Sequence, residues 1–383
     1  MMKVAVGHSN DPDSPAAITE VLEQCVSTLS GLKPQAGILF AAIDFDHSLI
    51  LHQIDQALPG IELIGGTTDG ELSSLMGFQQ DSLTLMLFCA DALEIRAGIG
   101  RAVSKNPGVA TQQAVAQASS TLSLPPKLCL TTPESLTTSA TLILDGLKLA
   151  LGEVPIFGGL TGDQSRLRQT YQFFKTEVLS DAVPVLLFAG DLHLSCGVAS
   201  GWQPVGQAGT VTKSHQNVVE EINDKPALDF YSRYLGGLPP SAEYPLAVFN
   251  NHSANFYLRA PHEVHDLAQG SIKFAGDVPE RAIVQITEAS RAEILTAAKT
   301  SMQQALGSYP GTEPSAALFF SCVGRRQLLG MQIQEEYQLV NSCLSSPLPS
   351  CGFYTYGEIS PFELAGNTQY HNETFITLIF GTR

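Results

Sequence analysis

Short apolar runs alternate with longer amphipathic runs over the first hundred residues, a pattern typical of strands alternating with helices. The predicted elements are strands at residues 3–6, 37–42 and 62–65 and helices at residues 16–29 and 48–58. The third strand runs into the Gly-rich turn GGTTDG at residues 65–70. Two further strands, at 82–89 and 93–99, then follow each other without a helix between them. This order predicts an α/β unit that ends in a meander and contains a mixed sheet.

The same order of elements recurs in the next hundred residues. Its predicted elements are helices at 109–121 and 139–151 and strands at 127–130 and 154–158. It also ends in a Gly-rich turn, GGLTGD at residues 158–163, and DSLTLMLFCAD from Asp81 matches DAVPVLLFAGD from Asp181. We infer an internal duplication of residues 1–100 and 101–205, and we expect the two copies to share one core in a pseudo-twofold arrangement.

The pattern changes from about residue 206, which predicts a second domain over residues 206–383 after a first domain over residues 1–205. Predicted helices in the second domain lie at 291–306 and 324–344. Predicted strands lie at 246–249, 256–259, 271–275, 282–287, 316–321, 352–357 and 374–380. The fold class that we predict for the whole chain is α/β with α+β character, in which helices cover mixed, largely antiparallel sheets.

Composition narrows the functional classes. Charged residues make up only 15% of the 383 residues and hydrophobic residues 44%, and the usual charged share is about 25%, so we expect a folded chain with a large core. An excess of 37 acidic over 21 basic residues gives a formal charge of −16. Because such a charge repels phosphate backbones and anionic lipids, we expect neither nucleic acid nor membrane as a partner.

The N-terminal segment and the cysteines give two further expectations. The opening residues, MMKVAVGHS, lack the apolar region and cleavage site of a signal peptide, and apolar runs stay far below the roughly 18 residues of a membrane span. We therefore expect a cytoplasmic protein. Seven cysteines form an odd set without a C-x-x-C pair, which predicts buried thiols and neither a disulfide framework nor a zinc ribbon.

Catalytic motifs are absent from the sequence. It contains no G-x-S-x-G, no G-x-x-x-x-G-K-[ST] and no H-E-x-x-H. The segment HEVH at residues 262–265 is one residue too short for a zinc-binding helix motif. This favours a protein that binds a ligand without transforming it.

The closing segment carries a family resemblance. Its strand end Tyr356, Gly357 and Glu358 is followed by His371, Asn372 and Thr374 at the start of the next strand. This pairing resembles the C-terminal module of the FIST family of bacterial sensory domains. The two Gly-rich turns resemble the N-terminal FIST module, and FYLRAP at 256–261 and FAGDVPE at 274–280 resemble the body of the C-terminal one. The resemblance implies a small-ligand sensor, with the N-terminal module at 1–205 and the C-terminal module at 206–383.

A FIST chain of this length without an attached kinase or cyclase segment is similar to the nitric-oxide-sensing members of the family. The resemblance therefore implies haem b as cofactor, nitric oxide as signal and a histidine kinase as signalling partner. Because the chain has no C-x-x-C-H motif, the haem is expected to be non-covalent. The candidate iron ligands, of which one is expected to bind, are His262, His265 and His252.

Two alternatives remain open. In the first, the ligand is amino-acid-like and there is no haem. Arg259 binds its carboxylate and Glu358 binds its amine, and together with Asn372 and Thr374 they recognise the backbone of the ligand. The competing structural explanation is a salt bridge between Arg259 and Glu358. In the second alternative, the protein is an enzyme that uses Glu358 and His371 as acid and base.

One position departs from the family pattern. The family's Asp-Val-Pro-Glu-Gly segment ends here in Arg281, so a backbone conformation that suits glycine is in question at this residue.

Overall fold

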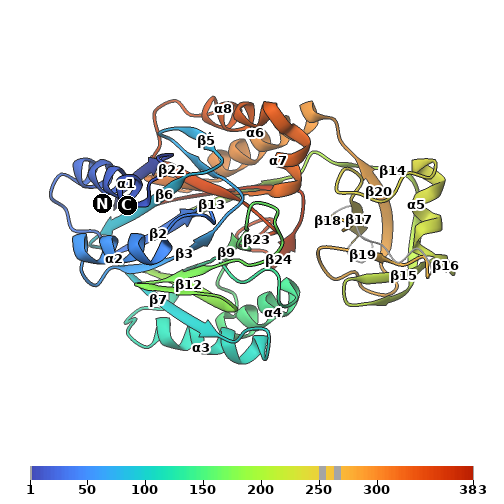
Figure 1. The fold of residues 1–383 in the computed structure, drawn as a ribbon, viewed down its shortest axis with the longest axis horizontal. Coiled ribbons are helices and arrows are strands. Elements are labelled where there is room, and N and C mark those ends of the chain that lie inside the picture. Colours follow the sequence, from blue (N-terminus) through green and yellow to red (C-terminus); the bar gives the residue numbers. More distant parts are fainter. Residues whose placement is uncertain (1, 250–255, 263–268, 383) are drawn as a thin grey trace.

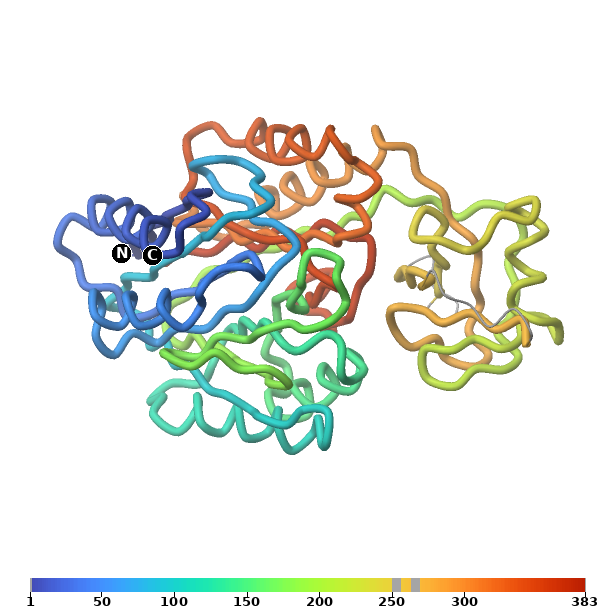
Figure 2. The backbone as a smooth tube through the Cα atoms, in the orientation of Figure 1, coloured from blue at the N-terminus to red at the C-terminus, as the bar shows by residue number. Residues whose placement is uncertain are grey.

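The computed structural model describes residues 2–249, 256–262 and 269–382 and shows a core with an outer lobe beside it (Figure 1). Residues 203–288 form the lobe at the right of the view, and the chain passes between lobe and core by two neighbouring strands (Figure 2). Helices cover mixed sheets in which antiparallel strand pairs predominate. The predicted α/β fold with largely antiparallel sheets is confirmed.

The first repeat of the core contains the elements β1 (Met2–Ser9), α1 (Ser14–Leu29), β2 (Ala36–Ala41), α2 (His47–Ala57), β3 (Glu62–Thr67), the hairpin β4 (Glu71–Ser73) and β5 (Gly77–Gln79), and β6 (Leu83–Ala90). Both helices begin at an aspartate whose side chain accepts a backbone hydrogen bond, Asp13 for α1 and Asp46 for α2. Such caps satisfy N–H groups that the first helical turn leaves unpaired. The apolar faces of both helices then pack on one face of the sheet.

The second repeat follows the same order of strand, helix, strand, helix, strand, hairpin and strand. Its elements are β7 (Leu93–Arg101), α3 (Pro107–Ser119), β8 (Pro126–Thr131), α4 (Ala140–Leu151), β9 (Ile156–Gly159), the hairpin β10 (Gln172–Phe174) and β11 (Glu177–Leu179), and β12 (Ala182–Gly190). Asn106 and Ser139 cap its helices.

A third copy of this order completes the core, and the lobe is inserted into it after its first strand. Its elements are β13 (His193–Ala199), α6 (Arg291–Gly307), β21 (Ala316–Cys322), α7 (Val323–Leu329), the 3-10 turn η1 (Gly330–Gln332), α8 (Ile333–Asn341), β22 (Ser350–Thr355), the hairpin β23 (Glu358–Pro361) and β24 (Thr368–His371), and β25 (Phe375–Gly381). A capping box between Ser290 and Glu293 begins α6.

Each core sheet combines four strands of one repeat with a hairpin of another. The strand orders are β1-β6-β2-β3-β10-β11, β7-β12-β8-β9-β23-β24 and β13-β25-β21-β22-β4-β5. The exchange is cyclic: the first repeat lends its hairpin to the third, the second to the first, and the third to the second. The core therefore has threefold pseudosymmetry, and no repeat completes its sheet alone.

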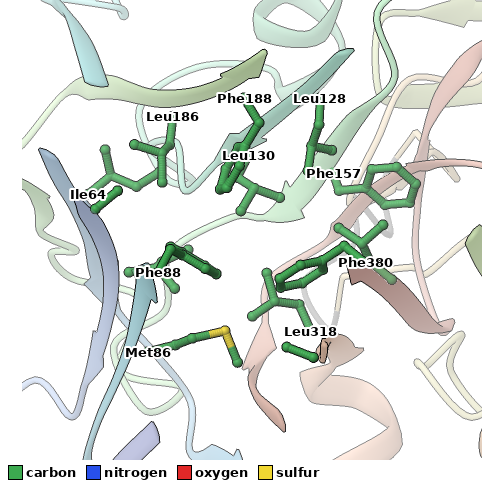
Figure 3. Packing of buried hydrophobic residues seen from close by; sticks show 14 of the residues in the cluster. Ile64, Met86, Phe88, Leu128, Leu130, Phe157, Leu186, Phe188, Leu318 and Phe380 are labelled. Carbon is green, nitrogen blue, oxygen red and sulfur yellow. The ribbon is translucent and has the colours of Figure 1, made fainter. Parts of the chain in front are cut away.

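The three sheets bury one shared apolar core (Figure 3). Phe88 from the first repeat, Phe188 from the second and Phe380 from the third belong to it, with the Phe88 and Phe188 ring centroids 5.3 Å apart. Burying large apolar side chains is the main driving force of folding, so this cluster binds the three repeats into one body. Helices cover the opposite face of each sheet.

The outer lobe has its own small core. Its elements are β14 (Gln203–His215), β15 (Val218–Ile222), β16 (Lys225–Pro226), α5 (Ala227–Leu235), β17 (Leu246–Phe249), β18 (Phe256–Arg259), β19 (Ile272–Lys273) and β20 (Ile283–Glu288). Phe230 and Tyr231 of α5 pack against Phe274 and neighbouring strands. Both aromatic side chains therefore belong to the core of the lobe.

The structure differs from the sequence-based expectation in three places. Strands β6 and β7 form no meander: β6 pairs with β1 and β2, whereas β7 pairs with β12 of the next repeat. The copies number three, so the expected pseudo-twofold relation is replaced by a threefold one. The helix expected over 324–344 is broken at Gly330, whose φ of +53° is unsuited to a continuous right-handed helix.

Candidate functional site

The Gly-rich turns of the first two repeats and the Tyr356–Gly357 turn of the third meet near the pseudo-threefold axis. A ring of three backbone hydrogen bonds joins them, from Asp69 N–H to Tyr354 C=O (3.0 Å), from Gly162 N–H to Thr67 C=O (2.8 Å) and from Tyr356 N–H to Leu160 C=O (3.4 Å). Each bond links two different repeats. The turns that the sequence singled out therefore build the junction of the core.

Polar side chains close this junction. Asp69 forms an ion pair with Arg326, and the Tyr356 hydroxyl donates to the Asp163 carboxylate. Burial raises the pKa of Asp69, opposed by the Arg326 charge. Burial also opposes ionisation of Asp163, but the bonds from Tyr356 and from three backbone N–H groups hold its pKa below the usual value. The junction is thus internally paired.

Next to the junction, the pairing of strands defines one equivalent position in each repeat. Glu71 lies opposite Phe353, Gln172 opposite Gly66, and Glu358 opposite Gly159. The sequence around two of them is nearly the same, TDGELS at 68–73 and TYGEIS at 355–360. This match is the signal that could have revealed the third repeat, and sequence analysis missed it.

Glu71 is fully buried and its carboxylate is fully bonded. The Thr68 hydroxyl donates to Oε1 and the Ser82 hydroxyl donates to Oε2. Nε2 of His8 lies 2.9 Å from the Ser82 hydroxyl and extends the network. Burial raises the pKa of Glu71 to about 8, opposed by these hydroxyls. This is a closed structural network.

Gln172 is saturated in the same way. Its Nε2 donates to Glu134 Oε2 at 3.2 Å and to the Thr161 hydroxyl at 3.0 Å, and its Oε1 accepts from the Ala182 N–H at 3.1 Å. Thr161 is the counterpart of Thr68, since both stand at the same place in their turns.

Glu358 is fully buried but only half bonded. Its Oε2 accepts from the Thr374 N–H at 3.1 Å and from the Thr374 hydroxyl at 2.7 Å. The Thr355 hydroxyl, the counterpart of Thr68, donates instead to the Gly357 carbonyl at 2.6 Å. Glu358 Oε1 consequently has no hydrogen-bond partner in the described part of the chain. Burial raises the pKa of Glu358 to about 8, opposed by the bonds from Thr374.

His371 faces Glu358 across the β23–β24 pair. Its Nε2 lies 2.9 Å from the Ser360 carbonyl, and its ring meets the Phe362 ring edge-on at 4.8 Å. Because a carbonyl only accepts, Nε2 carries the proton and Nδ1 is left as an acceptor. Nδ1 has no partner among residues 2–249, 256–262 and 269–382. Burial lowers the pKa of His371 to about 4, so the ring is neutral.

A cleft of about 790 Å³ opens beside this pair, between the lobe and the core. The lobe contributes β18, and the core contributes β13, the end of α6, the loop after β23, and His371 with Thr374. Its walls are a mixture of apolar and polar side chains, and Glu363 is the one charged residue among those lining it. The lining residues are Cys196, Val198, Ala199, Ser200, Phe256, Tyr257, Leu258, Gln304, Gly307, Ser308, Phe362, Glu363, Leu364, His371 and Thr374.

The structure gathers five of the seven predicted ligand-binding residues around the lobe–core boundary and puts Tyr356 and Gly357 at the junction. Arg259 is buried, and its Nε and Nη1 donate to backbone carbonyls of Asp277, Leu258 and Tyr370. No ion pair joins Arg259 to Glu358, both of which are described residues. Arg259 instead ties the lobe to β24.

Asn372 serves the same boundary, since its Oδ1 accepts from the Ala260 N–H of the lobe at 3.3 Å. Gly357 has a φ of +155°, and a Cβ placed on it would lie 2.1 Å from the Tyr370 hydroxyl. A side chain therefore does not fit at this position.

The predicted haem ligands are placed as follows. His262 lies between β18 and β19, where its backbone N–H donates to the Lys273 carbonyl at 2.8 Å, and it does not line the cleft. His252 and His265 lie outside the described residues. Within the described ranges, no group of three or more His, Cys, Asp and Glu side chains is placed to hold a metal ion. No described helix is long and apolar enough to cross a membrane.

Comparison with known proteins places this chain in a family. The model of the FIST N domain matches residues 35–225, and the model of the FIST C domain matches residues 227–361. An uncharacterized protein of Methanocaldococcus jannaschii is 25% identical over 273 residues, which are 62% of this chain and 51% of that protein. The chain thus spans about half the length of this curated relative. A crystal structure of cyanuric acid hydrolase from A. caulinodans aligns over the full length of both chains with a TM-score of 0.38 and 11% identity.

Proposed function

The chain belongs to the FIST family, whose domains have a sensory, ligand-binding role in signalling, and we propose that it senses a small ligand bound in the lobe–core cleft. The observation that carries this proposal is His371, a fully buried side chain that lines the cleft with an unpaired acceptor atom. Buried polar atoms without a partner are rare in proteins. At a cleft, a ligand is the natural partner.

The placement of the cleft suits a sensor. One wall belongs to the lobe and the others to the core, so a bound ligand contacts both bodies. A ligand shifts a conformational equilibrium only when it binds the two states differently, and a site shared by two bodies meets this condition when their separation changes. We propose that occupancy changes how the lobe sits on the core, and that a cytoplasmic signalling partner reads this change without any catalysis by this chain.

Small molecules that copurify with the protein test this proposal. The protein is purified under native conditions and denatured, and released compounds are identified by mass spectrometry. Ser200→Trp fills the cleft, since Ser200 lines it and is partly exposed, whereas Ser27→Trp places the same side chain on the exposed face of α1. We expect a compound released from wild type and Ser27→Trp but not from Ser200→Trp. Equal release from all three proteins, or none from any, would contradict the proposal.

Haem b does not fit this cleft. An axial ligand could come from His371, but the two haem propionates would meet Glu363 and no basic side chain among the lining residues. Haem bound elsewhere through His252, His262 or His265 stays a prediction, together with nitric oxide as signal and a histidine kinase as partner. An absorption spectrum of protein from haem-replete cells checks this prediction. A haem band that His252→Ala, His262→Ala or His265→Ala removes would support it, and absence of the band from wild type would reject it.

The two remaining alternatives also stay predictions. An amino-acid-like ligand would need Arg259 to exchange its backbone carbonyl partners for a carboxylate. An enzyme would use Glu358 and His371, which stand opposite each other in the sheet without a hydrogen bond between them. If the copurified compound is converted on incubation, and Glu358→Gln stops its conversion but not its binding, the enzyme alternative is correct.

A further inference from the structure

The three equivalent positions of the core act as an internal control for what a buried polar residue needs here. At Glu71 and Gln172 the side-chain polar atoms are paired within the protein. At Glu358, Oε1 is unpaired, and so is Nδ1 of its cross-strand neighbour His371. Two of the three sites are therefore complete, and the third lacks a donor. It also lies next to the cleft, which His371 and Thr374 line.

Nδ1 of His371 accepts a hydrogen bond, and Oε1 of Glu358 accepts one when the carboxyl group is ionised. Directly opposed residues in an antiparallel pair have Cβ atoms about 4.5–5.5 Å apart, so Glu358 and His371 lie close enough for one donor group to serve both. Glu358 stands behind Thr374, whose hydroxyl it binds and which lines the cleft. An ammonium or amidinium group carries several N–H donors and no acceptor. It complements a pair of acceptors.

The charge around the site selects in the same direction. Glu363 lines the cleft, and Glu358 is buried behind Thr374. The buried guanidinium groups that act on His371 and Glu358, those of Arg259 and Arg325, are bonded to carbonyl and carboxylate groups inside the protein. The residues lining the cleft include no lysine or arginine. The whole chain carries a formal charge of −16. The remaining walls combine apolar and aromatic side chains, among them Phe362 and Tyr257, with the polar side chains of Ser200, Gln304 and Ser308. Such walls suit an apolar ring and attract a cation placed over an aromatic face.

We propose that the cleft recognises a small organic cation, an ammonium or amidinium group on an apolar ring without a carboxylate, through Glu358 Oε1 and His371 Nδ1. This inference rests on the proposed ligand-binding function of the same cleft and names the class of ligand. It assigns Glu358 to charge selection and assigns Glu71, its counterpart, to structure alone.

Three probes of similar shape and different charge test the inference: benzylammonium, benzyl alcohol and benzoate. Their affinities for the full-length protein are measured by ligand-observed NMR titration, which reaches millimolar dissociation constants. We expect benzylammonium to bind wild type at least ten times more tightly than benzyl alcohol, and benzoate not to bind. Glu358→Gln should reduce the ratio between the first two probes to about one, because it removes the carboxyl group that ionises against a bound cation and retains the shape. Glu71→Gln should leave the ratio unchanged.

The wild-type series decides the inference even if a variant fails to fold. Benzyl alcohol or benzoate binding as tightly as benzylammonium would overturn the charge selection, while cleft binding itself would stand. No binding of any probe would also overturn it, and the copurification experiment with Ser200→Trp would then judge the sensor proposal independently. A preference for benzylammonium that Glu71→Gln abolishes and Glu358→Gln leaves intact would place the site elsewhere and reject the assignment.

Discussion

Glu71 and Glu358 occupy the same place in two repeats and have nearly the same sequence around them, yet their hydrogen-bond partners differ. Threonine and serine hydroxyls use both oxygens of Glu71. Thr374 uses one oxygen of Glu358, because the hydroxyl of Thr355 is bonded to the turn backbone. The repeats can therefore be compared with each other. The carboxylate of Glu71 shows the hydrogen bonds that the fold supplies by itself, and the unpaired oxygen of Glu358 shows where a ligand can bind.

The turn glycines that precede the two glutamates offer the largest expected effect. A Cβ at Gly357 would lie 2.1 Å from the hydroxyl of Tyr370, a buried residue whose hydroxyl is hydrogen-bonded. A Cβ at Gly70 would lie 2.7 Å from the ring edge of Phe78. Both glycines have positive φ. We expect Gly357→Ala to lower the free energy of unfolding by about 4 kcal/mol and Gly70→Ala by about 2 kcal/mol, as measured by urea denaturation. Equal losses would show that Tyr370 yields as easily as Phe78.

Apolar replacement of the two carboxylates should separate their roles. Glu71→Leu leaves the buried hydroxyls of Thr68 and Ser82 without their acceptor, and we expect a loss of about 3 kcal/mol. Glu358→Leu removes the hydrogen-bond acceptor of Thr374 but also removes an unpaired buried oxygen. We therefore expect the free energy of unfolding to fall by only about 1 kcal/mol. Urea unfolding at one fixed pH measures both. A larger loss at Glu358 than at Glu71 would refute the assignment of Glu71 to structure and Glu358 to binding.

The pH dependence of stability should be common to both sites. Burial raises the pKa of Glu71, Glu358 and Glu373 to about 8 in the folded protein, while an unfolded glutamate titrates near 4.3. The folded state then holds more protons between these values, so stability is full at low pH and falls as pH rises towards 8.

Each such carboxyl contributes a slope of about 1.4 kcal/mol per pH unit. The groups around Glu358 are Glu373, Cys322, His371 and Arg325, and of these Glu373 titrates in the same range. Replacing either Glu71 or Glu358 by Gln should remove one such slope between pH 5 and 8. Unfolding curves at several pH values measure it, and an unchanged slope in Glu358→Gln would mean that this carboxyl is ionised in the folded state.

Arg281 offers the smallest effect, in the lobe and away from both glutamates. Arg281 adopts the left-handed backbone conformation that suits glycine, with a φ of +67°. Glycine takes this conformation without strain but loses more chain entropy on folding. We expect Arg281→Gly to raise the free energy of unfolding by about 0.5 kcal/mol. This variant should leave probe binding unchanged, and a change in probe binding would show that the lobe edge influences the cleft.

The local parts of the fold could be predicted from the sequence because their signals are local. Alternating apolar runs indicated most strands, and glycine content indicated the two turns, whereas the meeting of these turns at the junction was not predicted. The third repeat escaped because residues 203–288 separate β13 from α6. The hairpin exchange escaped as well, since the pairing of β4 with β22 links residues far apart in the chain and has no sequence pattern of its own.

The candidate site was only partly accessible to sequence reasoning. The family resemblance singled out Glu358 and His371, but periodicity could not show that they are cross-strand neighbours. Arg259 illustrates the opposite case: a buried arginine can serve a ligand or backbone carbonyls, and only its observed partners distinguish the two. The cleft depends on how lobe and core meet, so residues such as Val198 and Phe362 carried no sequence signal.

The central claim is that Glu358, unlike its counterpart Glu71, exists to hold a ligand. Quantifying the small molecule released on denaturation from wild type, Glu358→Gln and Glu71→Gln tests it most directly, with each protein purified in the same way. The account predicts equal amounts from wild type and Glu71→Gln and at least a tenfold smaller amount from Glu358→Gln. Equal amounts from both variants, or a loss confined to Glu71→Gln, would contradict it.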